Sequence, residues 1–155
     1  MSGDKNQIDV AAALIFRAGK ILITQRHANS HLGGLWEFPG GKREPNETFE
    51  LCLVREIREE LGMEISVGKL LREITHDYAN KTVNLKFFIC QLMDGEPQPL
   101  GCKAFRWAGK SELDDYKFLP ADTKLLLKLK TSPEFLVKPS RKPLQRLGGN
   151  CFRRC

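Results

Sequence analysis

The sequence lacks any apolar stretch long enough to cross a bilayer. In its N-terminal half the longest unbroken apolar run, residues 10–16, has seven residues, whereas a membrane-spanning helix needs about 20. The first nine residues, MSGDKNQID, are polar and show no signal-peptide pattern. We therefore expect a cytoplasmic protein with no membrane partner.

Cysteine is scarce, and its spacing does not suggest pairing. The five cysteines are Cys52, Cys90, Cys102, Cys151 and Cys155. Their number is odd and no two form a C-x-x-C pair. This pattern favours reduced thiols over a disulfide framework or a zinc site.

Net charge is nearly absent from most of the chain, although the formal net charge of the whole is +6. Residues 139–155 supply +5 of it and contain no acid, which leaves residues 1–138 at +1. A nucleic-acid groove in the main part is therefore not indicated. We expect one domain over residues 1–138, followed by a basic, disordered tail over residues 139–155. Only this tail is a candidate for binding RNA or an acidic partner, and it is equally open to being an inert extension.

Hydrophobic periodicity and turn residues predict the order of the elements in the first half. Strands are expected at 8–16 and 20–25, a loop at 26–34 and a short extended piece at 36–38. Pro39-Gly40-Gly41 predicts a tight turn. A helix should follow, capped by Asn46 or Thr48 and ended by Gly62.

The second half predicts further strands and two helices. One or two strands are expected at 63–75, a strand with period-two alternation at 83–90 and a short strand at 104–108. Residues 111–114 resemble a capping box that starts a short helix, and a last helix should run from Pro120 to Lys130. The fold class is therefore α/β, a mixed sheet between helices.

Three carboxylates crowd one turn of the predicted central helix. Glu56, Glu59 and Glu60 lie at i, i+3 and i+4, so they project from one side and repel one another. Oxygen-only ligands suit hard cations such as Mg²⁺ or Mn²⁺. The alternative is a merely solvated charged face.

A helical wheel argues against that alternative. The apolar stripe of this helix consists of Phe49, Leu53, Ile57 and Leu61. Glu60 falls within the same arc, with Glu56 at its edge. A solubilising glutamate would lie opposite the stripe, so the pattern favours a metal site.

The same stretch resembles a known family. Gly41, five residues, Glu47, seven residues and the run REIREELGM at 55–63 match the complete box of the Nudix hydrolases. The resemblance covers about residues 8–130 and is closest to the MutT-like branch, which carries a run like EFPGGK (37–42) before the box. It implies an α/β/α sandwich that hydrolyses a nucleoside triphosphate to a monophosphate and pyrophosphate with Mg²⁺, or alternatively Mn²⁺.

The resemblance also implies roles for individual residues around the metal. The implied ligands are the carbonyl of Gly40 and the carboxylates of Glu56, Glu59 and Glu60. Arg55 is expected to pair with Glu47 and hold the ligands in place. An Arg55–Glu59 surface pair at i, i+4 is the alternative, and both can hold.

A nucleotide site is implied by residues scattered along the chain. By resemblance it comprises Arg26, His31, Phe38, Lys42, Tyr78, Lys81 and Asp122. Tyr78 and Phe38 are expected to flank the base, where one stacked ring contributes about 1–3 kcal/mol. The alternatives are a core residue for Phe38, a solvated loop residue for Lys42 and an ordinary loop histidine for His31.

At two positions the residue differs from the one that some relatives carry. An ionised Asp122 offers acceptors only, which suits an amino group on cytosine or an oxidised adenine unless the site protonates it. An N-terminal helix aspartate would look the same. Gly101 stands where some relatives carry a glutamate, so the general base is left open between Glu59 and a metal-bound hydroxide.

These features predict a pyrophosphohydrolase that clears oxidised or modified nucleotides, such as 8-oxo-dGTP or CTP-type and dCTP-type pyrimidines. An enzyme acting on ADP-ribose or a dinucleoside polyphosphate is the first alternative, and a non-catalytic nucleotide- or nucleic-acid-binding module is the second. We expect a monomer or a homodimer.

Overall fold

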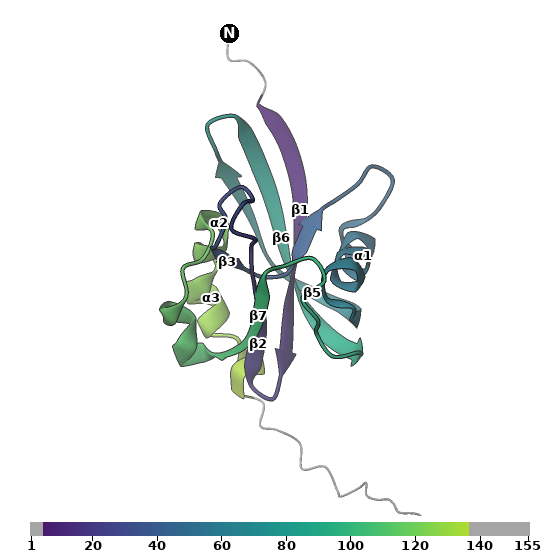
Figure 1. Cartoon of the computed structure of the whole chain (residues 1–155), viewed down its shortest axis with the longest axis vertical. Helices are drawn as coiled ribbons and strands as arrows, with labels where there is room; N and C mark the ends of the chain where they lie inside the picture. The colour runs from purple at the N-terminus through teal and green to yellow at the C-terminus, as the bar shows by residue number, and fades with distance from the viewer. Residues whose placement is uncertain (1–4, 137–155) are drawn as a thin grey trace, which may run out of the picture.

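Seven strands form a single mixed sheet in the computed structural model, which describes residues 5–136. Figure 1 shows helix α1 on one side of the strands and α2 and α3 on the other. The strands are β1 (Asn6–Arg17), β2 (Lys20–Gln25), β3 (Trp36–Glu37), β4 (Gly40–Lys42), β5 (Glu64–Asp77), β6 (Lys81–Asp94) and β7 (Ala104–Gly109). The helices are α1 (Phe49–Leu61), η1 (Lys110–Asp115), α2 (Pro120–Thr123), α3 (Leu126–Lys130) and η2 (Pro133–Leu136).

Strand β1 organises the sheet. It pairs in parallel with β6 and antiparallel with β4 and, at its far end, with β2. The remaining pairs, β5 with β6 and β2 with β3 and β7, are antiparallel. The predicted mixed sheet between helices is therefore confirmed.

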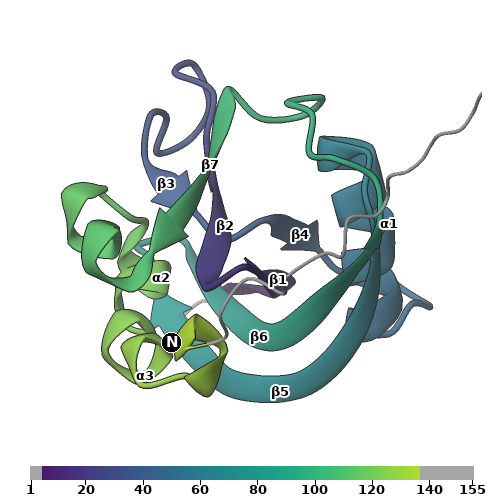
Figure 2. The ribbon, with the colours of Figure 1, turned by 90° about the horizontal axis from the view of Figure 1, so that it is seen from below.

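The alternation of side chains along β1 divides the core into two. Ala12 and Leu14 face the side of α2 and α3, while Ala13 and Ile15 face α1. The α1 side is filled by the predicted stripe of this helix, in which Leu53, Ile57 and Leu61 are completely buried. Figure 2 shows how β5 and β6 curve around this arrangement, with α1 and α3 at opposite ends of the curve.

Helix α1 begins and ends as predicted. Of the two candidate caps, Thr48 is the one used, because its Oγ1 accepts a 3.0 Å hydrogen bond from the Leu51 N–H. Gly62 ends the helix with φ 69°, and its N–H donates to the Arg58 carbonyl. These two caps fix the register in which the glutamates of α1 face the rest of the molecule.

The predicted tight turn at residues 39–41 is wrong. Gly40–Lys42 is strand β4, paired antiparallel with β1. The glycines serve close approach rather than a turn. A Cβ on Gly40 would lie 1.9 Å from the Ala11 carbonyl oxygen, and one on Gly41 would lie 2.3 Å from Glu56 Cδ.

Two predictions near the C-terminal end of the domain also need correction. The short helix η1 is capped two residues earlier than expected, because Glu112 accepts a 2.7 Å hydrogen bond from the Gly109 N–H. The last helix is divided into α2 and α3. A bond from the Leu125 N–H to the Asp122 carbonyl closes a tighter, i to i−3 turn between them.

Of the one or two strands expected at 63–75, the structure has one, β5, and its pairing with β6 shifts register near Gly68. No helix within residues 5–136 is long and apolar enough to cross a membrane. The predicted tail at 139–155 lies outside the described residues.

Candidate active site

A cavity of about 360 Å³ opens where α1, β4, the β5–β6 turn and α2 meet. Most of the predicted site residues line it: Arg26, His31, Phe38, Gly40, Lys42, Glu56, Glu60, Tyr78, Lys81 and Asp122. Glu47, Arg55 and Glu59 do not. The structure thus brings the acidic helix and the scattered nucleotide residues around one space.

Two of the three box glutamates on α1 face this space. The Glu56 side chain is 16% exposed, whereas that of Glu59 is 60% exposed. Burial raises the pKa of Glu60 to about 8, with further contributions from the charges of Glu37 and Glu56. Burial likewise raises the pKa of Glu56. The site therefore crowds carboxyl groups together where burial disfavours their ionised forms, which a bound cation would favour.

Arg55 is the cation nearest to these carboxylates. Its Nη2 lies 2.6 Å from Glu47 Oε1 and its Nε 3.1 Å from Glu47 Oε2, which confirms the predicted pair. Its Nη1 contacts Glu56 Oε2 at 2.9 Å and also Glu59 Oε1 at 3.4 Å, so the i, i+4 contact is present too. The hydrogen bonds from Arg55 lower the pKa of Glu47 to about 2. Arg55 therefore ties the loop before α1 to the inward face of the helix.

The donor set at this end of the cavity fits a hard divalent cation. It consists of carboxylate oxygens on Glu56 and Glu60, beside the backbone of Gly40, and oxygen ligands are what Mg²⁺ and Mn²⁺ prefer. Within residues 5–136, no three acidic, histidine or cysteine side chains are already grouped as a metal site. Glu59 is instead turned toward Arg55.

Glu37 is a residue that sequence reasoning missed. It lines the cavity and pairs with Arg26 at 3.3 Å. Burial nevertheless raises its pKa, because that effect exceeds the lowering by Arg26. Its charge in turn helps to raise the pKa of Glu60 and of Asp122. The signal available was its place in the EFPGGK run, directly before the glycine pair.

Asp122 is buried in the opposite wall, with only 3% of its surface exposed. The Phe38 N–H donates a 2.9 Å hydrogen bond to its Oδ2. The segment leading into α2 is held against β3 by a hydrogen bond from the Leu119 N–H to the Trp36 carbonyl. Burial raises the pKa of Asp122 well above its ordinary value, and Glu37 adds to the effect. The carboxyl group is therefore biased toward its neutral form, which can donate as well as accept.

Tyr78 forms the part of the wall beyond the end of β5. Its ring centroid lies 6.2 Å from that of His31, and Lys81 Nζ lies 5.4 Å from its centre. Arg26 orients the loop that carries His31, because its Nε donates a 2.8 Å hydrogen bond to the His31 carbonyl. Tyr78 thus contributes an aromatic ring to the wall of the cavity.

Phe38 and Gly101 both take part in packing. Phe38 is 2% exposed and stacks on Phe118 with centroids 5.2 Å apart, so it is a core residue that also reaches the cavity. Gly101 packs against α1, where a Cβ would lie 3.3 Å from Glu60 Cγ. The loop at 101 therefore approaches the glutamate cluster but contributes no carboxylate to it.

Comparison with known proteins gives a consistent result. Residues 11–128 match the model of the NUDIX domain family. The chain is 41% identical over 119 residues to the CTP pyrophosphohydrolase of Escherichia coli, covering 77% of this chain and 88% of that protein. It is 42% identical over 87 residues to the 8-oxo-dGTP diphosphatase of Proteus vulgaris, covering 56% and 78%. The solution structure of the MutT protein of methicillin-resistant Staphylococcus aureus is similar, with a TM-score of 0.69, 38% identity and coverage of 83% and 98%.

Proposed function

The chain belongs to the Nudix hydrolase family, and we propose that it is a nucleotide pyrophosphohydrolase that depends on a divalent metal, Mg²⁺ in the first place. It would convert a nucleoside triphosphate and water into a nucleoside monophosphate and pyrophosphate. Two similar proteins are named for CTP and for 8-oxo-dGTP, which supports this reaction class. Such a substrate and the buried free thiols of Cys52, Cys90 and Cys102 suit a cytoplasmic setting.

One observation carries the proposal. The same cavity is lined by the carboxylates of Glu56 and Glu60 from α1 and by Tyr78 and Asp122 from the segments after β5 and in α2. A nucleotide needs this combination, because its phosphates require a cation and its base requires a flat surface with hydrogen-bonding groups. Lys42 and Lys81 also line the cavity and supply positive charge for phosphate oxygens.

The residues of the chain would divide the work between metal and substrate. Glu56 and Glu60, with Glu59 and the Gly40 carbonyl, would hold the metal, whose chemistry is to neutralise phosphate charge and lower the pKa of a bound water. Arg55 would keep Glu56 in its orientation through the contact of 2.9 Å. Glu59 is the candidate for accepting the proton of the attacking water, because Gly101 has no side chain to do so.

Base selection would rest on Asp122. Its raised pKa makes a neutral carboxyl group available, and this group can both donate and accept. A neutral carboxyl suits the mixed donor and acceptor edge of 8-oxoguanine, whereas the ionised form suits the amino group of cytosine. We therefore propose that both 8-oxo-dGTP and CTP-type nucleotides are substrates, in the role of clearing modified nucleotides.

The test is a kinetic comparison with Mg²⁺ over CTP, dCTP, 5-methyl-dCTP, 8-oxo-dGTP, 2-hydroxy-dATP and ADP-ribose, with the products identified. Release of pyrophosphate and a monophosphate from CTP-type or 8-oxo-dGTP substrates is expected. A preference for ADP-ribose would overturn the proposed substrate class, although the chain would still be a Nudix hydrolase. Nucleotide binding without turnover of any compound would instead indicate a binding module.

A further inference from the structure

Tyr78 is contacted by side chains from three directions. His31 approaches it from the loop after β2, Lys81 from the start of β6, and His76 from its own strand. His31 and Lys81 line the cavity themselves. His76 is not among the lining residues, so it contacts Tyr78 without itself lining the ligand space.

The contact between His76 and Tyr78 is the closest of these aromatic contacts. His76 is the next-to-last residue of β5 and Tyr78 is the residue just after the strand, so the two are two positions apart in extended chain and their side chains point to the same side. The ring centroids are 4.6 Å apart with an interplanar angle of 65°, an edge-to-face geometry that aromatic pairs prefer. No other ring contact of Tyr78 in residues 5–136 is as short.

Hydrogen bonding does not account for a histidine at this position. Its Nδ1 is buried and has no hydrogen-bond partner among the described residues. A buried polar atom left in this state is unfavourable for folding. What the ring does make is an aromatic contact with Tyr78. Burial and the charge of Lys124 lower the pKa of His76, although Asp77 opposes them.

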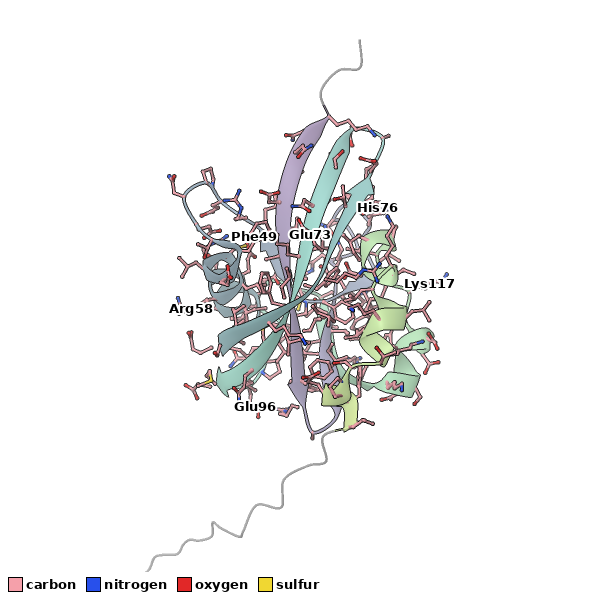
Figure 3. The ribbon with its side chains drawn as sticks, turned by 180° about the vertical axis from the view of Figure 1, so that it is seen from behind. Phe49, Arg58, Glu73, His76, Glu96 and Lys117 are labelled. Atoms are coloured by element: carbon pink, nitrogen blue, oxygen red, sulfur yellow. The ribbon has the colours of Figure 1, made fainter. Side chains whose placement is uncertain are left out.

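The other neighbours of His76 extend the connection to the base site. Lys124 follows α2 directly, and α2 packs against β5. Figure 3 shows His76 on β5 beside the ribbon of this helical layer. The same α2 carries Asp122. His76 is therefore on the strand that leads to Tyr78, and this strand packs against the helix that carries Asp122.

We propose that His76 is a positioning residue for base recognition. Through its edge-to-face contact, its ring holds the Tyr78 ring in place in the wall of the nucleotide cavity. The inference rests on the proposed function, since it assumes that a base lies against Tyr78. His76 does not touch the substrate. Its effect is to keep the tyrosine in the orientation that a stacked base needs before the nucleotide binds.

The orientation of Tyr78 can be observed without any activity. The chain has two tyrosines, Tyr78 and Tyr116, so labelling with 3-fluorotyrosine gives two fluorine resonances that a Tyr116→Phe variant assigns. In His76→Ala the Tyr78 resonance should move toward that of the free amino acid, with Tyr116 unchanged as the internal control. In His76→Phe, which keeps an aromatic edge and has no orphan nitrogen, the Tyr78 resonance should stay dispersed.

Kinetics with CTP and 8-oxo-dGTP then test the functional part. His76→Ala should raise KM about threefold to tenfold, a part of what one stacked ring contributes, while kcat stays within about twofold. His76→Phe should restore the wild-type KM. Thr75→Ala is the matched control, because Thr75 is the preceding residue on β5 and is exposed.

The outcomes separate this proposal from the proposed function. A Tyr78 resonance and a KM that are both unchanged in His76→Ala overturn the role of His76 alone. A fall in kcat at constant KM also overturns it, because it would place His76 in the chemical step. A wild-type protein that hydrolyses no nucleotide, and whose Tyr78 resonance does not respond to CMP, overturns the proposed function together with this inference.

Discussion

The carboxylate of Asp122 and the backbone of Phe38 are joined by a hydrogen bond of 2.9 Å, although 84 positions separate them in the chain. Phe38 is two residues before Gly40 of β4, Asp122 lies in α2, and both residues line the cavity. One buried side chain thus takes part in the fold and faces the ligand space. Its substitution should affect stability and selectivity in ways that can be told apart.

Asp122→Asn should keep the fold and change the selectivity. The amide oxygen can still accept from the Phe38 N–H, while the amide offers a fixed donor that an ionised carboxylate lacks. The ratio of kcat/KM for 8-oxo-dGTP to that for dCTP should rise relative to the wild type. Asp122→Ala leaves a buried N–H without a partner and should lower the free energy of unfolding by about 1–3 kcal/mol. An unchanged ratio in Asp122→Asn would contradict a base-facing role.

The same variant should remove a pH dependence of stability. The pKa of Asp122 is raised from 3.8, so between 3.8 and its folded pKa the folded state binds more protons than the unfolded state. The free energy of unfolding of the wild type should therefore fall as pH rises through this window, and that of Asp122→Asn should fall less. Urea titrations at several pH values measure this. Parallel curves for the two proteins would contradict a raised pKa.

Glu60→Gln should abolish turnover without weakening the fold. It replaces a partly buried carboxylate by a neutral group of similar shape, so the metal-free melting temperature should not fall. Turnover should drop roughly 100-fold or more, because several kcal/mol of metal-dependent charge stabilisation are lost. Mg²⁺ should raise the melting temperature of the wild type and not of the variant. Wild-type activity in Glu60→Gln would remove this residue from the metal site.

Arg55 should be more sensitive to substitution than the neighbouring Arg58. Arg55 contacts Glu47, Glu56 and the Lys42 carbonyl together, and a lysine cannot reproduce that fork. Arg55→Lys should lower kcat/KM by about 10- to 100-fold, the range typical of residues that orient metal ligands.

The control is Arg58→Lys on the same helix. Arg58 pairs with Glu64 at an exposed position, where ion pairs contribute little. Activity of Arg58→Lys should therefore stay close to that of the wild type. Equal losses in both arginine variants would mean that the effect comes from the helix as a whole.

The local sequence pattern alone predicted that Glu56 and Glu60 lie together, but not that Tyr78 and Asp122 line the same cavity, for a physical reason. Glu56 and Glu60 lie on one helix, whose period fixes their direction once the apolar stripe is known. Tyr78 and Asp122 meet only through the pairing of β5 with β6 and the packing of α2, which no local pattern specifies. Only the family resemblance pointed to them, and their roles in substrate binding stay predictions.

Non-local contacts also explain which features of the site the sequence did not predict or predicted wrongly. Glu37 gains its importance from burial beside Arg26, Glu60 and Asp122, and residue spacing does not encode such a neighbourhood. Gly40 and Gly41 indicate a turn by local propensity, yet pairing with β1 makes them a strand. The two adjacent glycines did indicate that a Cβ cannot be accommodated at these two positions.

Changing Gly40 or Gly41 to alanine should have different effects on stability and on the metal site. At Gly40 the new Cβ would lie 1.9 Å from a backbone oxygen of β1, which cannot yield without separating β4 from β1. Gly40→Ala should therefore lower the melting temperature strongly. At Gly41 the Cβ would meet the carboxylate of Glu56, the far end of a flexible side chain. Gly41→Ala should stay folded, with Glu56 displaced from the metal end of the cavity.

Comparing thermal melts with Mg²⁺-dependent kinetics on both variants checks this contrast. Gly41→Ala should need more Mg²⁺ for half-maximal activity, and its melting temperature without metal should stay close to that of the wild type. If Gly41→Ala melted as early as Gly40→Ala, the glycine pair would serve the sheet alone. If instead Gly41→Ala kept the wild-type Mg²⁺ dependence, the position of Glu56 in the metal-free protein would not be the one that holds the metal.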